Sequence, residues 1–274
     1  MANIEGTIGC QFEFIVIDNS DNRYNIFEAY NLGVIQSKGD ILCFMHDDIL
    51  FHTSNWGEKV CDYLKDEKIG GIGIAGSPYV AKTIGTWWGG GLINQHQLHT
   101  VNGKLNLISR YCDKIEAKQK EVVVLDGVWF CIKRNIFMQI SFDEINFTGF
   151  HFYDIDIALQ VYQAGYRLLT VYDILIEHNS QGNLNRQWFE NAKAFNQKWK
   201  RLLPFSSGKI SFAKACTAEL RTINELTIIE IGNGRPAKEV YLDAMKRLLA
   251  DKRLYLFYRS PKYFAYFLHN YLKA

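Results

Sequence analysis

The feature that most constrains the fold is a strand–helix–strand pattern over residues 12–50, in which two apolar runs stop abruptly at polar side chains. Phe14–Ile17 runs into Asp18-Asn19-Ser20, and Ile41–Met45 runs into His46-Asp47-Asp48. Continuous apolar runs are typical of strands buried on both faces of a parallel sheet. Because such sheets collect ligand-binding groups at the carboxyl ends of their strands, the two polar clusters predict one shared cleft.

Alternating strand and helix patterns continue beyond this unit. Residues 55–64 have helical spacing, and residues 69–76 form a Gly-rich apolar run typical of a buried strand. Further elements are expected at residues 121–127 and 129–132 (strands), 155–162 (a helix that Gly165 ends) and 167–176 (a strand). Residues 77–120 predict a long loop-and-hairpin region. The sequence therefore predicts an α/β fold with a mostly parallel sheet flanked by helices.

The chain of 274 residues is long enough for one large domain, or for a domain of about 200 residues with an appendage. Pro204 and Ser206-Ser207-Gly208 indicate a boundary, beyond which the pattern is rich in helix. We expect an α/β domain at residues 1–205 and a helical C-terminal extension at residues 206–274.

Composition excludes few functions. The formal net charge of +2 gives no electrostatic reason to expect a nucleic-acid partner. The six cysteines are scattered singly and indicate buried free thiols of a reducing compartment, with no disulfide framework or zinc site. No signal-peptide pattern and no apolar run of about 20 residues is apparent. These observations predict a cytoplasmic protein.

Several short pieces of the sequence, in order and spacing over residues 12–180, carry a family resemblance. The pieces are residues 14–20, 29–33, 38–48, 126–127, 142–144, 153–159 and 164–166. Together they resemble the GT-A-fold glycosyltransferases, a Rossmann-like fold, and specifically the inverting family two with its bacterial glycosyltransferase-like branch. The resemblance implies transfer of a sugar from a nucleotide-diphosphate sugar to an acceptor hydroxyl, with a role in surface polysaccharide or glycan synthesis.

The resemblance also implies the nucleotide-sugar site. Its candidate residues are Asp18, Asn19, Asn31, Gly33, His46, Asp47, Asp126 and Arg186. His46-Asp47-Asp48 occupies the position of an Asp-x-Asp motif, whose last aspartate binds a divalent cation, Mn²⁺ or Mg²⁺. These cations favour oxygen ligands, so Asp48 is the expected ligand, with His178 as a second candidate and His46 as a neighbour.

Simpler interpretations of these residues stay open. Asp47 and Asp48 also suit a polar loop after a strand, and Asp18 suits an Asx turn with Asn19. Asn31 and Gly33 suit an ordinary helix end, and a lone histidine at a strand end is commonly structural. Arg186 is as well suited to a surface ion pair as to a diphosphate.

Asp154 corresponds to the second acid of the family's Glu-Asp pair, whose aspartate serves as catalytic base, while Tyr153 stands in place of the first acid. A carboxylate in the first turn of a helix is also what an N-terminal cap would show. Asp156 lies about 200° further around the helix, so only one of the two can be the base. We assign Asp156, with Trp87 and Trp88, to the acceptor, although core packing explains the tryptophans equally well.

Three departures from the family favour an alternative, a non-catalytic relative that binds nucleotide sugars or glycans. His46 and Tyr153 each replace an acid, and the apolar strand that normally begins the family's fold has no counterpart, because residues 1–11 supply only the end of the helix that follows it. Without that strand, ladder groups of its neighbours would lack partners.

The C-terminal segment from Lys246 to Ala274 interleaves basic and aromatic residues. This composition suits peripheral contact with a membrane surface, such as the inner membrane face, where a lipid-linked acceptor could reside. The alternative is a helix that packs its aromatic face on the catalytic domain.

Overall fold

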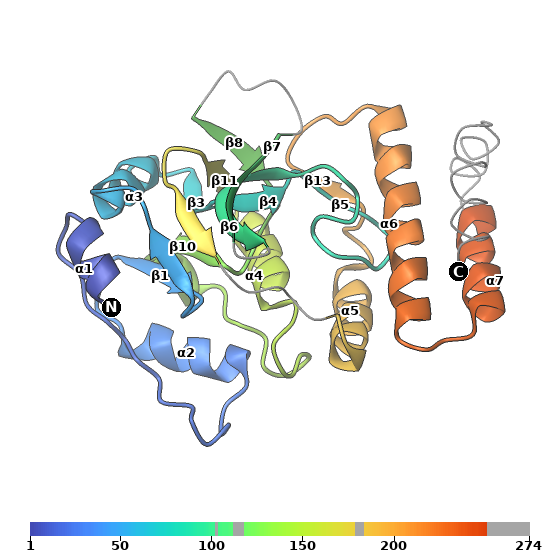
Figure 1. Cartoon of the computed structure of the whole chain (residues 1–274), viewed down its shortest axis with the longest axis horizontal. Coiled ribbons are helices and arrows are strands. Elements are labelled where there is room, and N and C mark those ends of the chain that lie inside the picture. Colours follow the sequence, from blue (N-terminus) through green and yellow to red (C-terminus); the bar gives the residue numbers. More distant parts are fainter. Residues whose placement is uncertain (102–103, 112–117, 179–183, 251–274) are drawn as a thin grey trace.

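The computed structural model describes residues 1–101, 104–111, 118–178 and 184–250, which form an α/β structure with helices around two sheets (Figure 1). The helices are α1 (Ala2–Thr7), α2 (Ile26–Gln36), α3 (Trp56–Leu64), the 3₁₀ helix η1 (Arg134–Met138), α4 (Tyr153–Gln163), α5 (Arg186–Trp199), α6 (Phe212–Gly232) and α7 (Ala237–Ala250). The predicted α/β class is confirmed.

A five-stranded sheet forms the centre, in the order β1 (Ile41–Met45), β10 (Trp129–Lys133), β3 (Ile69–Gly73), β11 (Arg167–Val171) and β8 (Gln119–Val122). The ladder between β3 and β11 is parallel, and the other three ladders are antiparallel. Strands β1, β3 and β11 therefore run the same way, but β10 is inserted between β1 and β3 in the opposite sense. The sheet is more mixed than the mostly parallel one expected.

A second sheet has the order β2 (Ile49–Phe51), β12 (Ile176–His178), β6 (Asn94–Val101), β4 (Ala75–Ser77) and β9 (Val124–Leu125), with β7 (Lys104–Arg110) paired to β6. Strands β6 and β7 form the hairpin expected within residues 77–120. A short ladder joins β13 (Phe205–Ser206) to β5 (Tyr79–Val80).

The apolar core lies on both faces of the five-stranded sheet. Side chains alternate between the faces of a strand, so Phe130 and Ile132 of β10 join one cluster while Trp129 and Cys131 join the other. Helices α2, α4 and α5 pack on the first face, and α1 and α3 pack on the second. This double cover explains why β1, β3 and β10 read as apolar runs in the sequence.

The strand predicted at Phe14–Ile17 is wrong. Residues 11–19 form neither helix nor strand, and Val16 is 69% exposed. No strand of the described chain pairs with this segment, and a strand is stable only beside a neighbour that takes up its backbone hydrogen bonds. The rings of Phe12 and Phe14 instead pack edge to face, 5.1 Å apart.

The prediction of free thiols is wrong for two cysteines. Cys43 of β1 and Cys131 of β10 lie directly opposite each other in an antiparallel ladder and are joined in a disulfide. Opposed residues of such a ladder bring their side chains together, and these two Cα atoms are 4.1 Å apart. Cys10 and Cys61 are free and Cys61 is exposed, Cys216 is buried in α6, and Cys112 lies outside the described residues. The cytoplasmic location stays a prediction.

Helices α6 and α7 stand side by side at one end of the molecule, opposite the end that carries α1 and α2 (Figure 1). Strand β13 lies at the predicted boundary between residues 205 and 206 and pairs back to β5. The division into two domains stays a prediction. Among the described residues, no helix combines the length and apolar character needed to cross a membrane.

Candidate functional site

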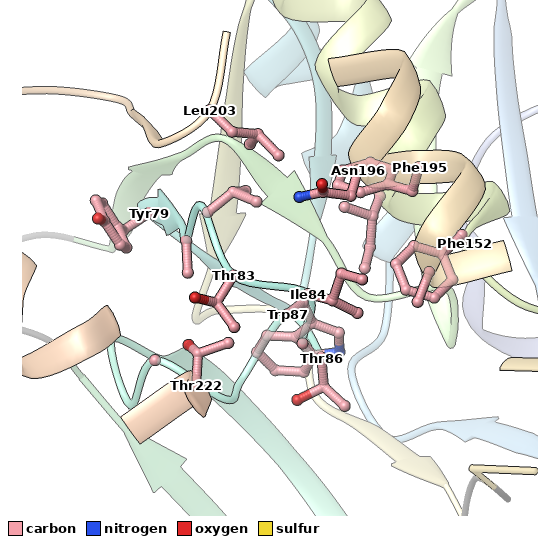
Figure 2. A pocket seen from close by; sticks show the side chains of 16 residues that line it. Tyr79, Thr83, Ile84, Thr86, Trp87, Phe152, Phe195, Asn196, Leu203 and Thr222 are labelled. Carbon is pink, nitrogen blue, oxygen red and sulfur yellow. The ribbon is translucent and has the colours of Figure 1, made fainter. Parts of the chain in front are cut away.

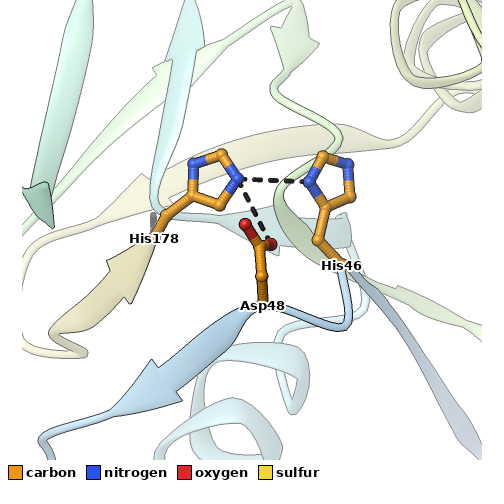
Figure 3. A group of neighbouring side chains, drawn as sticks. All are labelled: His46, Asp48 and His178. Atoms are coloured by element: carbon orange, nitrogen blue, oxygen red, sulfur yellow. Dashed lines mark hydrogen bonds and ion pairs between the residues drawn. The ribbon is translucent and has the colours of Figure 1, made fainter. Parts of the chain in front are cut away.

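A turn and two strand ends bring His46, Asp48 and His178 together (Figure 3). His46 follows the last residue of β1, and Asp48 precedes β2. Strand β12 pairs antiparallel with β2, and this register sets His178 opposite Ile49, next to Asp48. Residues 132 apart in the sequence thus meet because β1 leads directly into β2, to which β12 is paired.

The geometry of this group suits a bound cation. The Nδ1 atom of His46 lies 3.3 Å from Nε2 of His178, and the same Nε2 lies 3.5 Å from Oδ1 of Asp48. Candidate ligand atoms of the three residues all lie within 4.8 Å of one another. Oδ1 of Asp48 is buried and has no hydrogen-bond partner within the described chain. Leaving such an oxygen unsatisfied is costly, and a cation would satisfy it.

The chemistry of the donors agrees with this fit. Burial lowers the pKa of both His46 and His178, which favours the neutral imidazoles that metal binding requires. One carboxylate oxygen and two imidazole nitrogens suit a cation such as Mn²⁺ better than Mg²⁺, which prefers oxygen alone. The structure therefore adds His46, expected only as a neighbour, to the possible ligands.

Tyr153 links this group to the start of α4. Its hydroxyl lies 3.1 Å from Nε2 of His46 and donates to the carbonyl of Gly127 at 3.2 Å. A Cβ atom on Gly127 would collide with the Tyr153 ring and hydroxyl, so this close approach requires glycine. The sequence marks Tyr153 only as a replacement for an acid, and its contact with His46 was not predicted.

Asp154 lies in the first turn of α4 and is partly buried. Its carboxylate accepts hydrogen bonds from the amides of Gly127 and Ile155, each at 2.9 Å. Burial, and next the nearby charge of Asp126, raise the pKa of Asp154 to about 7, and the amides only partly oppose this. A carboxyl poised near neutral pH suits a general base, whereas a simple helix cap would have a depressed pKa.

Asp126 is the second carboxyl of this group. It accepts a hydrogen bond from the amide of Val128 at 2.9 Å, and the indole of Trp87 lies near it. Burial raises the pKa of Asp126, while the neighbouring His178 acts to lower it. Asp126 thus interacts with both Asp154 and His178, and it connects the candidate base to the candidate cation site.

The two tryptophans occupy different environments. Trp87 is buried and lines a narrow cavity together with Phe152 and Ile155, the residues on either side of Tyr153 and Asp154 (Figure 2). Trp88 is 39% exposed, and its ring meets that of Trp87 edge to face at 5.4 Å. Of the two rings, Trp88 is therefore the exposed one.

The predicted cleft between Asp18 and Asp48 is not supported. Asp18 is mostly exposed and accepts from the amide of Ser20, as in the Asx turn considered above. Within the described residues, no hydrogen bond or ion pair joins Asp18 to His46, Asp48 or His178. The segment was expected to end a strand of the sheet, and it lies outside the sheet because that strand does not form.

Asn19 and Asn31 make local structural contacts. Asn19 exchanges two hydrogen bonds with the backbone of Tyr24. Asn31 bonds both backbone groups of Phe142 and so ties α2 to the segment between η1 and α4. Gly33 lies within α2 and has open space where a Cβ would stand.

Three further predicted residues are not among the ligands of the cation group. Arg186 is 93% exposed and pairs with Glu190 at 3.2 Å, which is the surface alternative. Asp156 is buried between α4 and α5, where Lys198 and Trp199 donate to it at 2.8 Å. That contact holds two helices together and corrects its assignment to the acceptor. Asp47 is exposed, although its charge reaches His46.

One similar solved structure is described as the crystal structure of GalNAc-T7 with UDP, GalNAc and Mn²⁺. The two sequences are 14% identical, and the TM-score of the two structures is 0.44. The match covers 83% of this chain and 45% of that chain. The chain thus spans less than half the length of that protein. A search of curated proteins found no match. The profile described as "Glycosyltransferase like family" matches residues 1–199, well over half of the sequence. The chain belongs to this glycosyltransferase-like family.

Proposed function

We propose that this glycosyltransferase-family chain moves a sugar from a nucleotide-diphosphate sugar to an acceptor hydroxyl with inversion, and that Asp154 is its base. One observation carries the proposal. A carboxyl with a pKa raised to about 7 lies at the start of α4, directly after Tyr153, whose hydroxyl contacts His46 of the cation group. A base and a diphosphate site side by side are what single-displacement sugar transfer needs.

The reaction follows from these positions. Asp154 takes the proton from the acceptor hydroxyl, and the acceptor oxygen forms a bond to the anomeric carbon. The bond from that carbon to the diphosphate oxygen breaks, and its electron pair leaves with the nucleoside diphosphate. A single displacement from the opposite face inverts the configuration. A divalent cation held by His46, Asp48 and His178 would offset charge on the leaving group.

Trp88 and Asp126 complete the proposed site. The exposed ring of Trp88 is placed to pack against the apolar face of an acceptor sugar. Asp126 has its own raised pKa and lies close enough to influence Asp154, so the charge of Asp126 makes ionisation of Asp154 less favourable. We propose a role in surface polysaccharide or glycan synthesis, with a glycan or lipid-linked acceptor.

The decisive test measures donor binding and donor turnover separately. Calorimetry with a panel of UDP and GDP sugars, with and without Mn²⁺, is followed by an assay of nucleotide release. We expect Asp154→Asn to bind donor within about threefold of the wild type and to lose about a hundredfold or more in turnover. Asp62→Asn, on the exposed face of α3, is the matched control and should leave both unchanged.

Two outcomes would overturn the assignment. Undiminished turnover by Asp154→Asn removes this residue from the mechanism. Donor binding by the wild type without turnover of any donor favours the alternative, a relative that binds nucleotide sugars without catalysis, which the replacement of two acids by His46 and Tyr153 also suggests.

A further inference from the structure

Helix α6, which begins beyond the family-matched residues 1–199, packs directly on the Gly-rich loop that carries Trp87. The contacting residues of α6 are Ala218, Arg221, Thr222 and Glu225, and their spacing places them along one face of the helix. Added Cβ atoms on the loop glycines would meet these side chains: Gly85 meets Thr222, Gly89 meets Glu225, Gly90 meets Ala218 and Gly91 meets Arg221. The glycines therefore allow the backbone to lie against α6.

Glu225 makes the polar contacts of this interface. Its carboxylate accepts from the hydroxyl of Thr86 at 2.7 Å and from the amide of Thr86 at 3.2 Å. Burial raises the pKa of Glu225, and the bonds from Thr86 and the nearby indole of Trp88 act against this rise. One partly buried carboxylate therefore bonds to Thr86 and interacts with Trp88, the residues immediately before and after Trp87.

Glu219, almost two turns earlier on α6, holds the preceding part of the same loop. It accepts from the hydroxyl of Tyr79 at 2.9 Å and from the amides of Lys82 and Thr83 at 2.6 and 3.3 Å. The loop from residue 79 to residue 91 is thus fixed to α6 by two carboxylates, and Glu225 is the one nearest Trp87.

Trp87 transmits this position to the site. It is 8% exposed and lines the same cavity as Phe152, the residue just before α4 (Figure 2). Its indole also lies near the carboxyl of Asp126. The indole thus lies between the loop that Glu225 holds and the carboxyl next to Asp154.

We infer that Glu225 is a positioning residue, which acts through Thr86 and Trp88 to hold the indole of Trp87 against Asp126. The catalytic consequence of this contact rests on the proposed function, whereas the contact itself does not. Helix α6 thereby becomes part of the structure that shapes the site, although it does not touch the candidate base.

The contact is tested by ¹⁹F NMR of protein labelled with 5-fluorotryptophan. The chain has six tryptophans, and Trp87→Phe and Trp88→Phe assign the two resonances of interest. We expect Glu225→Ala to shift or broaden the Trp87 resonance and to leave those of Trp129 and Trp188 unchanged. Asp126→Asn should move the same Trp87 resonance. Glu239→Gln, on the exposed side of α7, is the control.

Turnover then tests the consequence. Glu225→Ala should lower kcat for nucleotide release about tenfold with KM for the donor within about threefold, because the loop shapes the reacting centre. Glu225→Gln, whose amide oxygen can still accept from Thr86, should recover most of the loss. In a Trp87→Phe background, Glu225→Ala should add little, since both changes break one connection.

Two results would overturn the inference: an unmoved Trp87 resonance in folded Glu225→Ala protein, or losses of kcat that multiply in the double variant. If the wild type turns over none of the donors, the proposed function fails, while the NMR result still decides whether Glu225 positions Trp87.

Discussion

At the scale of single residues, Asp154 is under opposing influences, and its pKa of about 7 reports the balance. Below that pH the carboxyl holds its proton and cannot accept another from an acceptor hydroxyl. We expect kcat/KM for transfer to rise with pH through about 7, as measured from about pH 5 to about pH 9. A profile that is flat across this range would separate Asp154 from the rate.

The same pKa affects stability with the opposite sign. A carboxyl whose pKa is higher in the folded than in the unfolded state favours folding when protonated, so this contribution is largest at low pH and is lost as pH rises toward 7. The proposed base therefore works best at a pH above the pKa of Asp154, where that carboxyl no longer stabilises the folded state.

Asp48 and His178 make a second residue-scale prediction. Because Oδ1 of Asp48 is buried without a hydrogen-bond partner among the described residues, Asp48→Ala should weaken Mn²⁺ binding, measured by calorimetry, by at least about tenfold. His178→Ala should do the same, and both should lose the metal-dependent part of donor binding. Equal Mn²⁺ affinity in Asp48→Ala and in Asp62→Ala would place the cation elsewhere.

Gly33 separates a structural from a functional role. It lies within α2 with open space around its Cα, so Gly33→Ala should raise the free energy of unfolding by about 0.5 to 1 kcal/mol. Chemical denaturation measures this change. Donor affinity should stay the same, and a clear loss of affinity would restore Gly33 to the nucleotide-sugar site for which its sequence position suggested it.

At the scale of elements, the apolar pattern of the sequence predicted the buried strands and the end of α4. Runs buried on both faces identified β1, β3 and β10, and Gly165, with a φ of +90°, follows α4 as expected of a C-terminal cap. The strand at Phe14–Ile17 failed because pairing depends on a neighbour, which a local pattern does not report.

In the candidate site, too, residues marked by a local pattern were predicted, and contacts between distant segments were not. Asp48, His178, Asp126 and Asp154 follow strands or begin a helix, and the structure gathers them. Asp18 and Arg186 suited the family pattern equally well, but an Asx turn and a surface ion pair account for them. The part played by Tyr153 and the disulfide between Cys43 and Cys131 depend on contacts between distant segments, which spacing alone does not reveal.

At the scale of the whole molecule, the chain ends in a basic and aromatic segment whose residues 251–274 lie outside the described structure. Peripheral membrane contact through this segment stays a prediction. Co-sedimentation with vesicles rich in anionic lipid should capture the full chain more than one ending at Ala250, with the difference shrinking at high salt. Equal sedimentation of the two would leave the segment no role at a membrane surface.

The pairing of β12 with β2 has a consequence for how such a chain can change. A strand shifted by a single residue presents its side chains to the opposite face. One amino acid inserted into or deleted from β12 before His178, with the pairing of Ile176 to Phe51 kept, would turn His178 away from Asp48, although every ligand remained in the sequence. The register of this short strand is therefore as much a requirement for holding the cation as the histidine itself.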